Sequence, residues 1–482
     1  MAHRALLVLL IAGLLVVSPE AHARGPRPVA ETIASLVQQA GLGDGIGIHV
    51  VRLHDAEELY RNQPERPRNP ASNQKLLTAA AALWRLGPTF EADTRLEGTI
   101  ENGRVSTLVV RPSGDPSLGY PALATFAESM RLRGVDSVDR ILIDDGYFDD
   151  QILPPAFGQQ PNEVASFRAA ISAFAVDRNS YVVHIGPGPE VGKPARVRVL
   201  ADGYILIDNR SVTTADGPPS PRIDHELTED GHLGVHVQGN IPQQVRTLYY
   251  RRRVPDPKAY AASLLVQAFR KAGLRGRLAI EYAAAPEALP LIGQMPSAPL
   301  STLLTGVGKW SDNFTAEMLL KIMGAEAERP GTSARGVVVV REELEKRGID
   351  TTGLVMVNGS GLFDGNRVAP QHLTQTLLAA YNDPSIRAEY VAHLAVGGSD
   401  GTLKSRLEGL PRSRMVRAKT GTLRDVIALS GYVLGEPGRS VAFSFLANGI
   451  AGRQKEARDL ADDIVRALAE YAVQPSRDSS IP

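Results

Sequence analysis

The sequence predicts an α/β protein in which an antiparallel sheet flanked by helices is interrupted by a large β-rich insertion. Helical and strand-like patterns occur together near both ends of the 482-residue chain, and short strand patterns separated by Pro and Gly fill its middle. The last helical pattern follows two strands in a hairpin arrangement. A single domain typically has roughly 100–150 residues, so a chain of this length is expected to form two or three domains.

The N-terminal third begins with a helix, two strands and a second helix. Apolar residues recur at helical spacing over residues 28–40, and strand patterns follow at 46–53 and 58–61. A second helix is predicted from about Ser72 to Leu86, and Gly87-Pro88 ends it, because Gly favours helix ends and Pro cannot continue a helix.

From about residue 91 the pattern changes to short strands. Residues 96–100 and 105–110 flank Asn102-Gly103, which predicts a hairpin with a type I′ turn. Further strands are predicted at 140–143, 181–185, 196–200, 204–207 and 233–237, and a helix at 258–272.

The final third ends in two strands, 426–434 and 440–447, and an amphipathic helix that carries Ala457, Leu460 and Ile464 on one face. If this helix packs on a sheet that also includes an N-terminal strand, both chain ends belong to one domain. We therefore expect a discontinuous domain of residues 24–90 and 286–473, with residues 91–285 as an inserted β-rich region of two subdomains.

The N-terminus has the pattern of a secretory signal peptide. His3-Arg4 precedes an apolar run, Ala5 to Val17, and Ala21-His22-Ala23 fits a cleavage site. The run is shorter than the about 20 residues of a membrane-spanning helix, although an uncleaved anchor or a buried helix is the alternative. We expect residues 1–23 to be a signal peptide, the mature protein to be soluble and periplasmic without a transmembrane anchor, and residues 474–482 to be a flexible tail.

Composition excludes several functions. Lys+Arg and Asp+Glu both number 53, so no net basic charge favours nucleic acid as a partner. The chain has no cysteine, which excludes disulfides, a thiol nucleophile and cysteine-based zinc sites. His225, His232 and His236 do not have the spacing of a zinc-binding helix, and no phosphate loop or dinucleotide fingerprint is present. We expect neither a metal nor a cofactor.

The first chemically informative motif is Ser72-Asn73-Gln74-Lys75. On a helix, Ser72 and Lys75 lie on the same face. A serine hydroxyl needs an adjacent base to act as a nucleophile, and a lysine whose pKa is lowered by burial or by another positive charge can be that base. Alone the motif is weak evidence, because it also describes a helix cap followed by a solvated lysine.

The second motif is Ser311-Asp312-Asn313. Ser311 can relay a proton to a leaving amine, and the Asn313 amide can hold a substrate backbone and Lys75. The same three residues are also a favourable helix start, so a purely structural role is the stronger interpretation of this motif alone.

The third motif, Lys419-Thr420-Gly421-Thr422, precedes an apolar strand. Lys419 and Gly421 share one face of a strand, and Gly421 removes bulk where a substrate backbone would run. Lys419 and the Thr420 and Thr422 hydroxyls can bind a free carboxylate, while the backbone N–H groups of Ser72 and Thr422 would form an oxyanion hole. The alternative is an ordinary turn into a hairpin, but chance occurrence of all three motifs in this order is improbable.

This set of motifs is typical of penicillin-binding proteins and class A β-lactamases. Longer stretches resemble the D-Ala-D-Ala carboxypeptidase/endopeptidase family of low-molecular-mass, class C penicillin-binding proteins along nearly the whole mature chain. They are residues 70–80, 114–118, 253–257, 311–317, 359–362 and 400–404. The resemblance implies a serine β-lactamase/transpeptidase-like domain with a large insertion, and acylation by β-lactams.

The chain also departs from the family pattern. Asn358 stands where members often carry Asp, and Phe363-Asp364 replaces a commoner Ser followed by a polar residue. Residues 154–167 lack the aromatic cluster that the resemblance implies for recognition of a diaminopimelate side chain. These departures leave the three motifs intact but leave the preferred substrate side chain open.

The expected function is that of a serine-type D-alanyl-D-alanine carboxypeptidase, D,D-endopeptidase or both, which acts on peptidoglycan stem peptides through an acyl-enzyme on Ser72 and is inhibited by β-lactams. A β-lactamase is the enzyme alternative, disfavoured by the chain length and the insertion. A catalytically silent cell-wall-binding protein is the alternative from another class. The sequence leaves the oligomeric state open, and a homo-oligomer remains an option.

Overall fold

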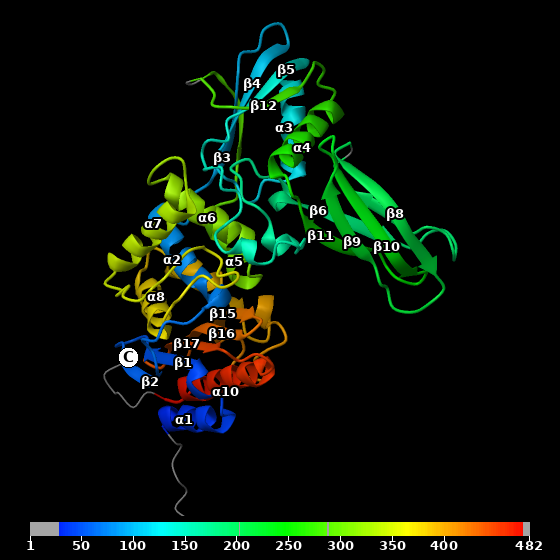
Figure 1. The fold of residues 1–482 in the computed structure, drawn as a ribbon. Helices are drawn as coiled ribbons and strands as arrows, with labels where there is room; N and C mark the ends of the chain where they lie inside the picture. The colour runs from blue at the N-terminus through cyan, green and yellow to red at the C-terminus, as the bar shows by residue number, and fades with distance from the viewer. Residues whose placement is uncertain (1–27, 202, 287–288, 476–482) are drawn as a thin grey trace, which may run out of the picture.

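The computed structural model describes residues 28–201, 203–286 and 289–475 (Figure 1). The expected signal peptide, residues 1–23, and residues 476–482 of the expected tail lie outside these ranges. None of the helices in the described ranges has the length and apolarity that crossing a membrane requires.

A six-stranded antiparallel sheet joins the two ends of the chain, as the sequence predicts. The strand order is β14-β15-β16-β17-β1-β2, so the N-terminal strand β1 pairs with the last strand, β17. Its strands are β1 (Ile46–Arg52), β2 (Glu58–Asn62), β14 (Ala395–Val396), β15 (Val416–Leu423), β16 (Val426–Val433) and β17 (Val441–Asn448).

Helices cover both faces of this sheet because its strands are apolar on both sides. On β17, Phe443 and Phe445 pack against α1 (Val29–Ala40) and α10 (Gln454–Ala472), whereas Ala442 and Leu446 point to the opposite core. Helices of that second core are α2 (Gln74–Leu86), α5 (Leu300–Lys309), α6 (Asn313–Ala325), α7 (Ser333–Glu345), α8 (Pro370–Asn382) and α9 (Arg387–Ala392).

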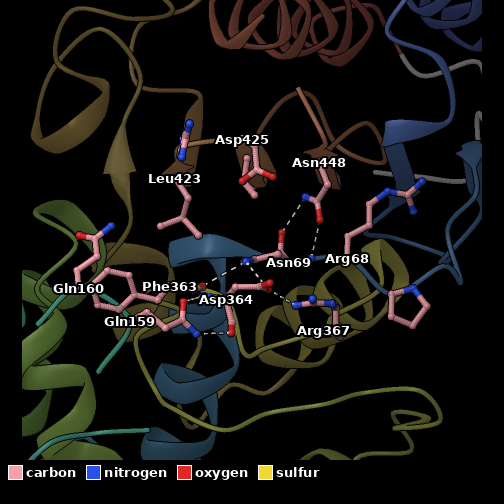
Figure 2. A pocket seen from close by; sticks show the side chains of 13 residues that line it. Arg68, Asn69, Gln159, Gln160, Phe363, Asp364, Arg367, Leu423, Asp425 and Asn448 are labelled. Carbon is pink, nitrogen blue, oxygen red and sulfur yellow. Dashed lines mark hydrogen bonds and ion pairs between the residues drawn. The ribbon is translucent and has the colours of Figure 1, made fainter. Parts of the chain in front are cut away.

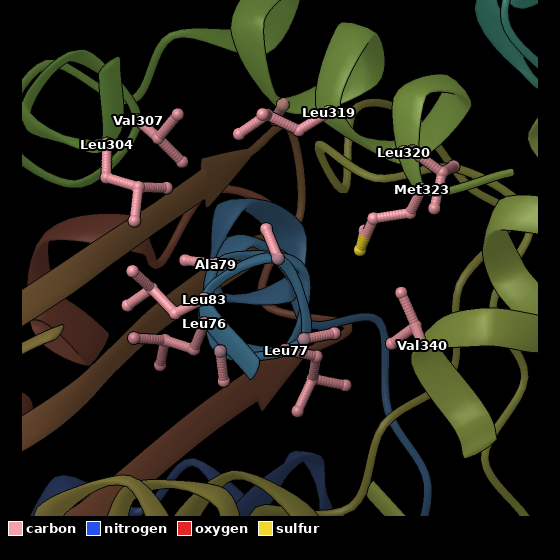
Figure 3. Packing of buried hydrophobic residues seen from close by; sticks show 14 of the residues in the cluster. Leu76, Leu77, Ala79, Leu83, Leu304, Val307, Leu319, Leu320, Met323 and Val340 are labelled. Atoms are coloured by element: carbon pink, nitrogen blue, oxygen red, sulfur yellow. The ribbon is translucent and has the colours of Figure 1, made fainter. Parts of the chain in front are cut away.

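Helix α2 lies at the centre of the second core. Residues 74–83 are all buried, and Figure 3 shows the helix with Leu304 and Val307 of α5, Leu320 of α6 and Val340 of α7 around it. A helix that is enclosed in this way is apolar over most of its surface, and its buried polar side chains at 74, 75 and 78 lie in its first turns. The alanines at 79–82 supply that apolar surface with little bulk.

The middle of the chain forms a five-stranded sheet and a pair of three-stranded sheets (Figure 1). The five-stranded sheet has the order β12-β5-β4-β3-β13 and packs against α3 and α4. Its elements are β3 (Asp93–Glu97), β4 (Arg104–Pro112), α3 (Tyr120–Leu132), β5 (Ser137–Ile143), α4 (Pro257–Lys271), β12 (Ala279–Tyr282) and β13 (Leu291–Pro296).

The two three-stranded sheets have the orders β8-β10-β9 and β11-β6-β7. Apolar residues of both, such as Val183 and Val235, share one core. The strands are β6 (Ser180–Gly186), β7 (Arg196–Val199), β8 (Ile205–Thr214), β9 (Arg222–Leu227), β10 (Leu233–Pro242) and β11 (Leu248–Arg253).

Three details differ from the sequence-based expectation. Strand β13 pairs with β3, so the chain leaves the five-stranded sheet after Pro296 and not at residue 285. Its Gly and terminal Pro weaken the strand signal in the sequence. The helix α3 was not expected in a segment dominated by strand patterns. The turn at Asn102-Gly103 does form, with positive φ at both residues, but β3 already ends at Glu97.

The enclosure of α2 makes its apolar side chains sensitive to truncation. Replacing fully buried Leu77 with Ala is expected to lower the free energy of unfolding by about 2–5 kcal/mol, because it removes buried methyl groups and leaves a cavity. Val338→Ala on α7, where the valine is 42% exposed, is the control and should change it by less than about 0.5 kcal/mol. Urea denaturation followed by circular dichroism measures both, and equal effects would contradict the central position of α2.

Candidate active site

Ser72 lies in a tight turn at the start of α2. The turn is a 3₁₀ segment, η2 (Ala71–Asn73), and Ala71 has a positive φ of 45°. The Asn69 side chain accepts a hydrogen bond from the Ala71 N–H at 2.9 Å. Gly361 packs against the same turn, where an added Cβ would stand 1.8 Å from the Ala71 carbonyl oxygen. The position of the half-buried Ser72 hydroxyl is therefore fixed by its neighbours on both sides.

Lys75 is fully buried directly behind Ser72. Its Nζ donates to Ser72 Oγ at 3.1 Å, to Asn313 Oδ1 at 2.7 Å and to the Ser360 carbonyl oxygen at 2.7 Å. These three acceptors match the three protons of an ammonium group. The structure thus brings Ser72, Lys75 and Asn313 together across 238 positions of sequence.

Burial lowers the pKa of Lys75 to about 7, and the nearby carboxylates of Glu317 and Asp312 oppose this shift. Desolvation disfavours the charged form of an amine, which is why the pKa falls. A substantial fraction of Lys75 is therefore neutral near pH 7 and can accept the Ser72 proton.

Glu317, for which the sequence predicted no function, holds the loop that faces Lys75. Its buried carboxylate accepts hydrogen bonds from the backbone N–H groups of Gly359 at 3.0 Å and Ser360 at 2.8 Å. Burial raises the pKa of Glu317. Glu317 and Ser360 both lie in stretches that resemble the family, and this was the only sequence signal that could have identified them.

Ser311 faces the second buried lysine. Lys419 Nζ donates to Ser311 Oγ at 2.9 Å and to the Thr420 carbonyl oxygen at 2.7 Å. Burial and the neighbouring Lys75 charge hold the pKa of Lys419 well below its usual range. Ser311 itself has a positive φ of 61°.

The capping interpretation of the second motif also holds. Asp312 is the N-cap of α6 and accepts from the Phe314 N–H at 3.1 Å. The Asn313 amide uses its Nδ2 to donate to the Phe167 carbonyl oxygen at 3.0 Å. One short segment therefore starts a helix, contacts both lysines and ties the inserted region to the site.

Strand β15 carries the third motif with alternating orientation. Lys419 and Gly421 are buried, Thr420 is half-buried and Thr422 is exposed. Gly421 also has a packing role that the sequence did not predict: a Cβ there would meet Pro70 O at 3.0 Å and Ala71 Cβ at 3.1 Å, so glycine permits close packing of β15 on the Ser72 turn.

Beyond Ala418, one edge of β15 is open. Strand β14 pairs only with Arg417 and Ala418, and no other strand within the described ranges pairs with residues 420–423 on that side. Thr420 Oγ1 is held by a hydrogen bond to Thr402 Oγ1 at 2.8 Å. This edge offers unpaired backbone groups beside Ser72.

A cavity of about 290 Å³ lies between residues 67–69, which precede the Ser72 turn, the end of β15 and the inserted region (Figure 2). In Figure 2, Asn69 bonds to Asn448, to the Phe363 carbonyl and to Asp364. Phe363 and Asp364, which depart from the family pattern, therefore line this cavity. Gln159 of the inserted region lines it as well.

Asn358, the other departure from the family pattern, stabilises the same loop as Glu317. Its Oδ1 accepts from the Gly361 N–H at 2.9 Å, and its Nδ2 donates to the carbonyl oxygens of Pro155 at 3.0 Å and Leu362 at 3.2 Å. The amide uses both its donor and its acceptor. An ionised aspartate could not make the two donor contacts.

Comparison with known proteins identifies the family of the chain. The family model described as the D-Ala-D-Ala carboxypeptidase 3 (S13) family matches residues 29–471. A D-alanyl-D-alanine carboxypeptidase of Actinomadura sp. (strain R39) is 34% identical over 462 residues, covering 92% of this chain and 84% of that protein. The D-alanyl-D-alanine carboxypeptidase DacB of Haemophilus influenzae is 25% identical and covers 88% and 90% of the two chains.

A solved structure has the same fold. Penicillin binding protein 4 (dacB) from Haemophilus influenzae superimposes with a TM-score of 0.76 at 24% identity, covering 91% of this chain and 98% of the other. A second structure of that protein, complexed with a β-lactam, gives a TM-score of 0.73 at 24% identity, covering 92% and 100% of the chains. The fold is thus that of the penicillin-binding proteins, with a transpeptidase-like domain and a large insertion. The chain belongs to the D-Ala-D-Ala carboxypeptidase 3 (S13) family and is a serine-type hydrolase.

Proposed function

We propose that this protein cleaves D-Ala-D-Ala-type bonds in peptidoglycan stem peptides through an acyl-enzyme on Ser72. The observation that carries the proposal is the hydrogen bond of 3.1 Å from Lys75 Nζ to Ser72 Oγ, made by a lysine whose pKa is lowered to about 7. A nucleophile within hydrogen-bond reach of a base with a matched pKa is the arrangement that covalent catalysis requires.

Acylation would begin when Ser72 Oγ attacks the carbonyl carbon of the penultimate D-Ala and neutral Lys75 takes its proton. The backbone N–H groups of Ser72 and Thr422 are suited to stabilise the oxyanion of the tetrahedral intermediate, since η2 and β15 pack closely at Gly421. When the intermediate collapses, the C–N bond breaks and the acyl group remains on Ser72.

The leaving amine needs a proton, and Ser311 is placed to relay it. Ser311 Oγ accepts a hydrogen bond from Lys419 at 2.9 Å, and Lys75 and Lys419 interact electrostatically. In this proposal the proton that Lys75 takes from Ser72 reaches the amine through Ser311. Water then hydrolyses the acyl-enzyme and restores Ser72.

The open edge of β15 suits an extended peptide. Its backbone would pair with residues 420–423, while the Thr420 and Thr422 hydroxyls bind the substrate carboxylate near the buried charge of Lys419. The cavity of Figure 2 would then receive a side chain of the stem peptide. If terminal D-Ala leaves, the enzyme acts as a carboxypeptidase, and if a cross-linking amine leaves, it acts as an endopeptidase.

The same site accounts for inhibition by β-lactams, whose strained ring presents an acylating carbonyl in place of the peptide. The β-lactam complex of the related Haemophilus influenzae protein supports this.

Export to the periplasm would bring the enzyme to its substrate, and the signal-peptide pattern of residues 1–23 supports that location.

Ser72 is the residue that we expect penicillin to modify. Mass spectrometry of the protein incubated with penicillin should show an adduct of one drug mass on Ser72, and Ser72→Ala should show none. Ser399→Ala, which removes an exposed serine, is the control and should keep the adduct. An unmodified native protein with intact drug would refute the proposal, and rapid drug loss without an adduct would indicate a β-lactamase.

The acylation rate should depend on the protonation of Lys75. Since the neutral amine is the active form and its pKa is about 7, the rate constant should rise roughly tenfold per pH unit below pH 7 and level off above it. Stopped-flow measurement with a chromogenic β-lactam between pH 5 and 9 tests this. Lys75→Arg should be inactive throughout, and a flat profile of the native enzyme would contradict the role of Lys75.

Glu317→Gln should have two effects. Loss of one hydrogen bond to the loop at 359–360 displaces the acceptor of Lys75 and should slow acylation about 10–100-fold. Loss of the negative charge should also move the pH midpoint down, because Glu317 raises the pKa of Lys75. Glu328→Gln, at a side chain that is 77% exposed, should change neither quantity. A slower rate with an unmoved midpoint would leave Glu317 only a structural role.

A further inference from the structure

Positive charge is concentrated on one sheet of the inserted region. Strands β6, β7 and β11 contain five arginines and no aspartate or glutamate, in a chain whose acidic and basic residues both number 53. The other three-stranded sheet differs: its outer face carries Asp208, Asp224 and Glu226 together with arginines. The charge of the first sheet is therefore local.

The strand register places three of these arginines on one outward face, which we call the cationic face. Tyr249 and Arg198 flank His184 on the two neighbouring strands, Arg251 lies beside Val182, and Arg196 lies beside Gly186. The cationic face is defined by Val182, His184, Arg196, Arg198, Tyr249 and Arg251.

This face is available to a ligand. Arg196, Arg198 and Arg251 are exposed, and among the described residues none of them forms an ion pair. Arg251 is held by donating to Ser180 Oγ at 3.0 Å. Tyr249 is 65% exposed, and its ring stands edge-on to His184 with centroids 5.0 Å apart. An aromatic side chain beside unpaired guanidinium groups is typical of a binding surface.

The cationic face continues toward the active site. Arg251 donates to the Asp177 carbonyl oxygen at 3.3 Å. Arg178, which follows Asp177 in the chain, forms an ion pair of 3.3 Å with Asp312, the neighbour of Ser311. At the end of β11, the Arg253 N–H donates to the Val164 carbonyl, in the segment whose Phe167 carbonyl meets Asn313. In Figure 1, β6 and β11 lie on the side of the inserted region that is nearer to α5 and α6, and β8, β9 and β10 lie farther away.

We propose that the cationic face binds the peptidoglycan polymer itself and retains it while the active site acts on its peptides. This inference rests on the proposed function. The polymer alternates sugar rings with stem peptides that bear free carboxylates. Guanidinium groups bind carboxylates through two parallel hydrogen bonds, and the exposed ring of Tyr249 can pack on the apolar face of a sugar.

The test measures binding separately from catalysis. Full-length Ser72→Ala protein, which cannot cleave the polymer, is sedimented with purified insoluble peptidoglycan from which phosphate-bearing polymers have been removed. The variant Arg196→Gln/Arg198→Gln should bind at least about tenfold more weakly, and Tyr249→Ala should also weaken binding. The matched control, Arg210→Gln/Arg222→Gln, removes two arginines from the other sheet and should bind within about twofold of the parent.

The same substitutions in protein with native Ser72 verify folding and catalysis. Penicillin acylation and release of D-Ala from a small soluble peptide should stay within about twofold of the parent, because the cationic face does not touch the reacting atoms. If the native enzyme is not acylated by penicillin and cleaves neither the terminal D-Ala bond nor the cross-link of small soluble peptides, the proposed function fails. If catalysis is intact but binding is unchanged by Arg196→Gln/Arg198→Gln, only this inference fails.

Two further results would overturn it. An equal loss of binding in the matched control would show that total charge, and not this face, governs retention. Binding that disappears when the phosphate-bearing polymers are removed would assign the face to a phosphate polymer. Binding that falls with rising salt only for protein with an intact cationic face would support the proposal.

Discussion

The structure depends on the burial of the Lys75 side chain against Ser72. An amine without contact to water is stable only if each of its protons finds an acceptor, and Lys75 has three, from Ser72, Asn313 and Ser360. Those acceptors come from three distant parts of the chain. Much of the fold around α2 therefore serves to bring them to one point and to keep water away.

A second buried lysine adds to the free-energy cost of desolvation in the same region. Lys419 is also fully buried, and burial together with the neighbouring Lys75 charge lowers the pKa of Lys419. Burial of two amines in one region favours their neutral forms and reduces the stability of the folded state. Glu317 offsets part of this cost, because its carboxylate lies near Lys75 and favours the charged form of that amine. The same carboxylate also fixes the loop at residues 359–360.

The insertion contacts the catalytic domain next to the candidate active site. The Phe167 carbonyl accepts from Asn313, and Arg178 pairs with Asp312, so two segments of the insertion touch the motif that starts α6. These contacts connect the insertion to residues that lie beside both buried lysines.

The order of three motifs and the family resemblance, rather than any single motif, identified Ser72, Lys75 and Lys419 as candidate site residues. The sequence alone also predicted the secondary structure near both chain ends. Local signals sufficed there: helical spacing for α2, Gly87-Pro88 at its end, and an apolar hairpin before α10. Only the tertiary structure decided how Glu317 is used, because a glutamate on a helix face carries no local sign of the backbone that it will meet.

Tertiary structure also decided which residues pack against Gly421 and how far the five-stranded sheet extends. Gly421 lies against the Ser72 turn, and β13 joins a strand that lies nearly 200 residues earlier in the chain. Periodicity reports which side of a strand is apolar, but it contains no information on which partner covers that side. Pairing and close approach follow from packing over the whole chain, and these set the geometry of the site.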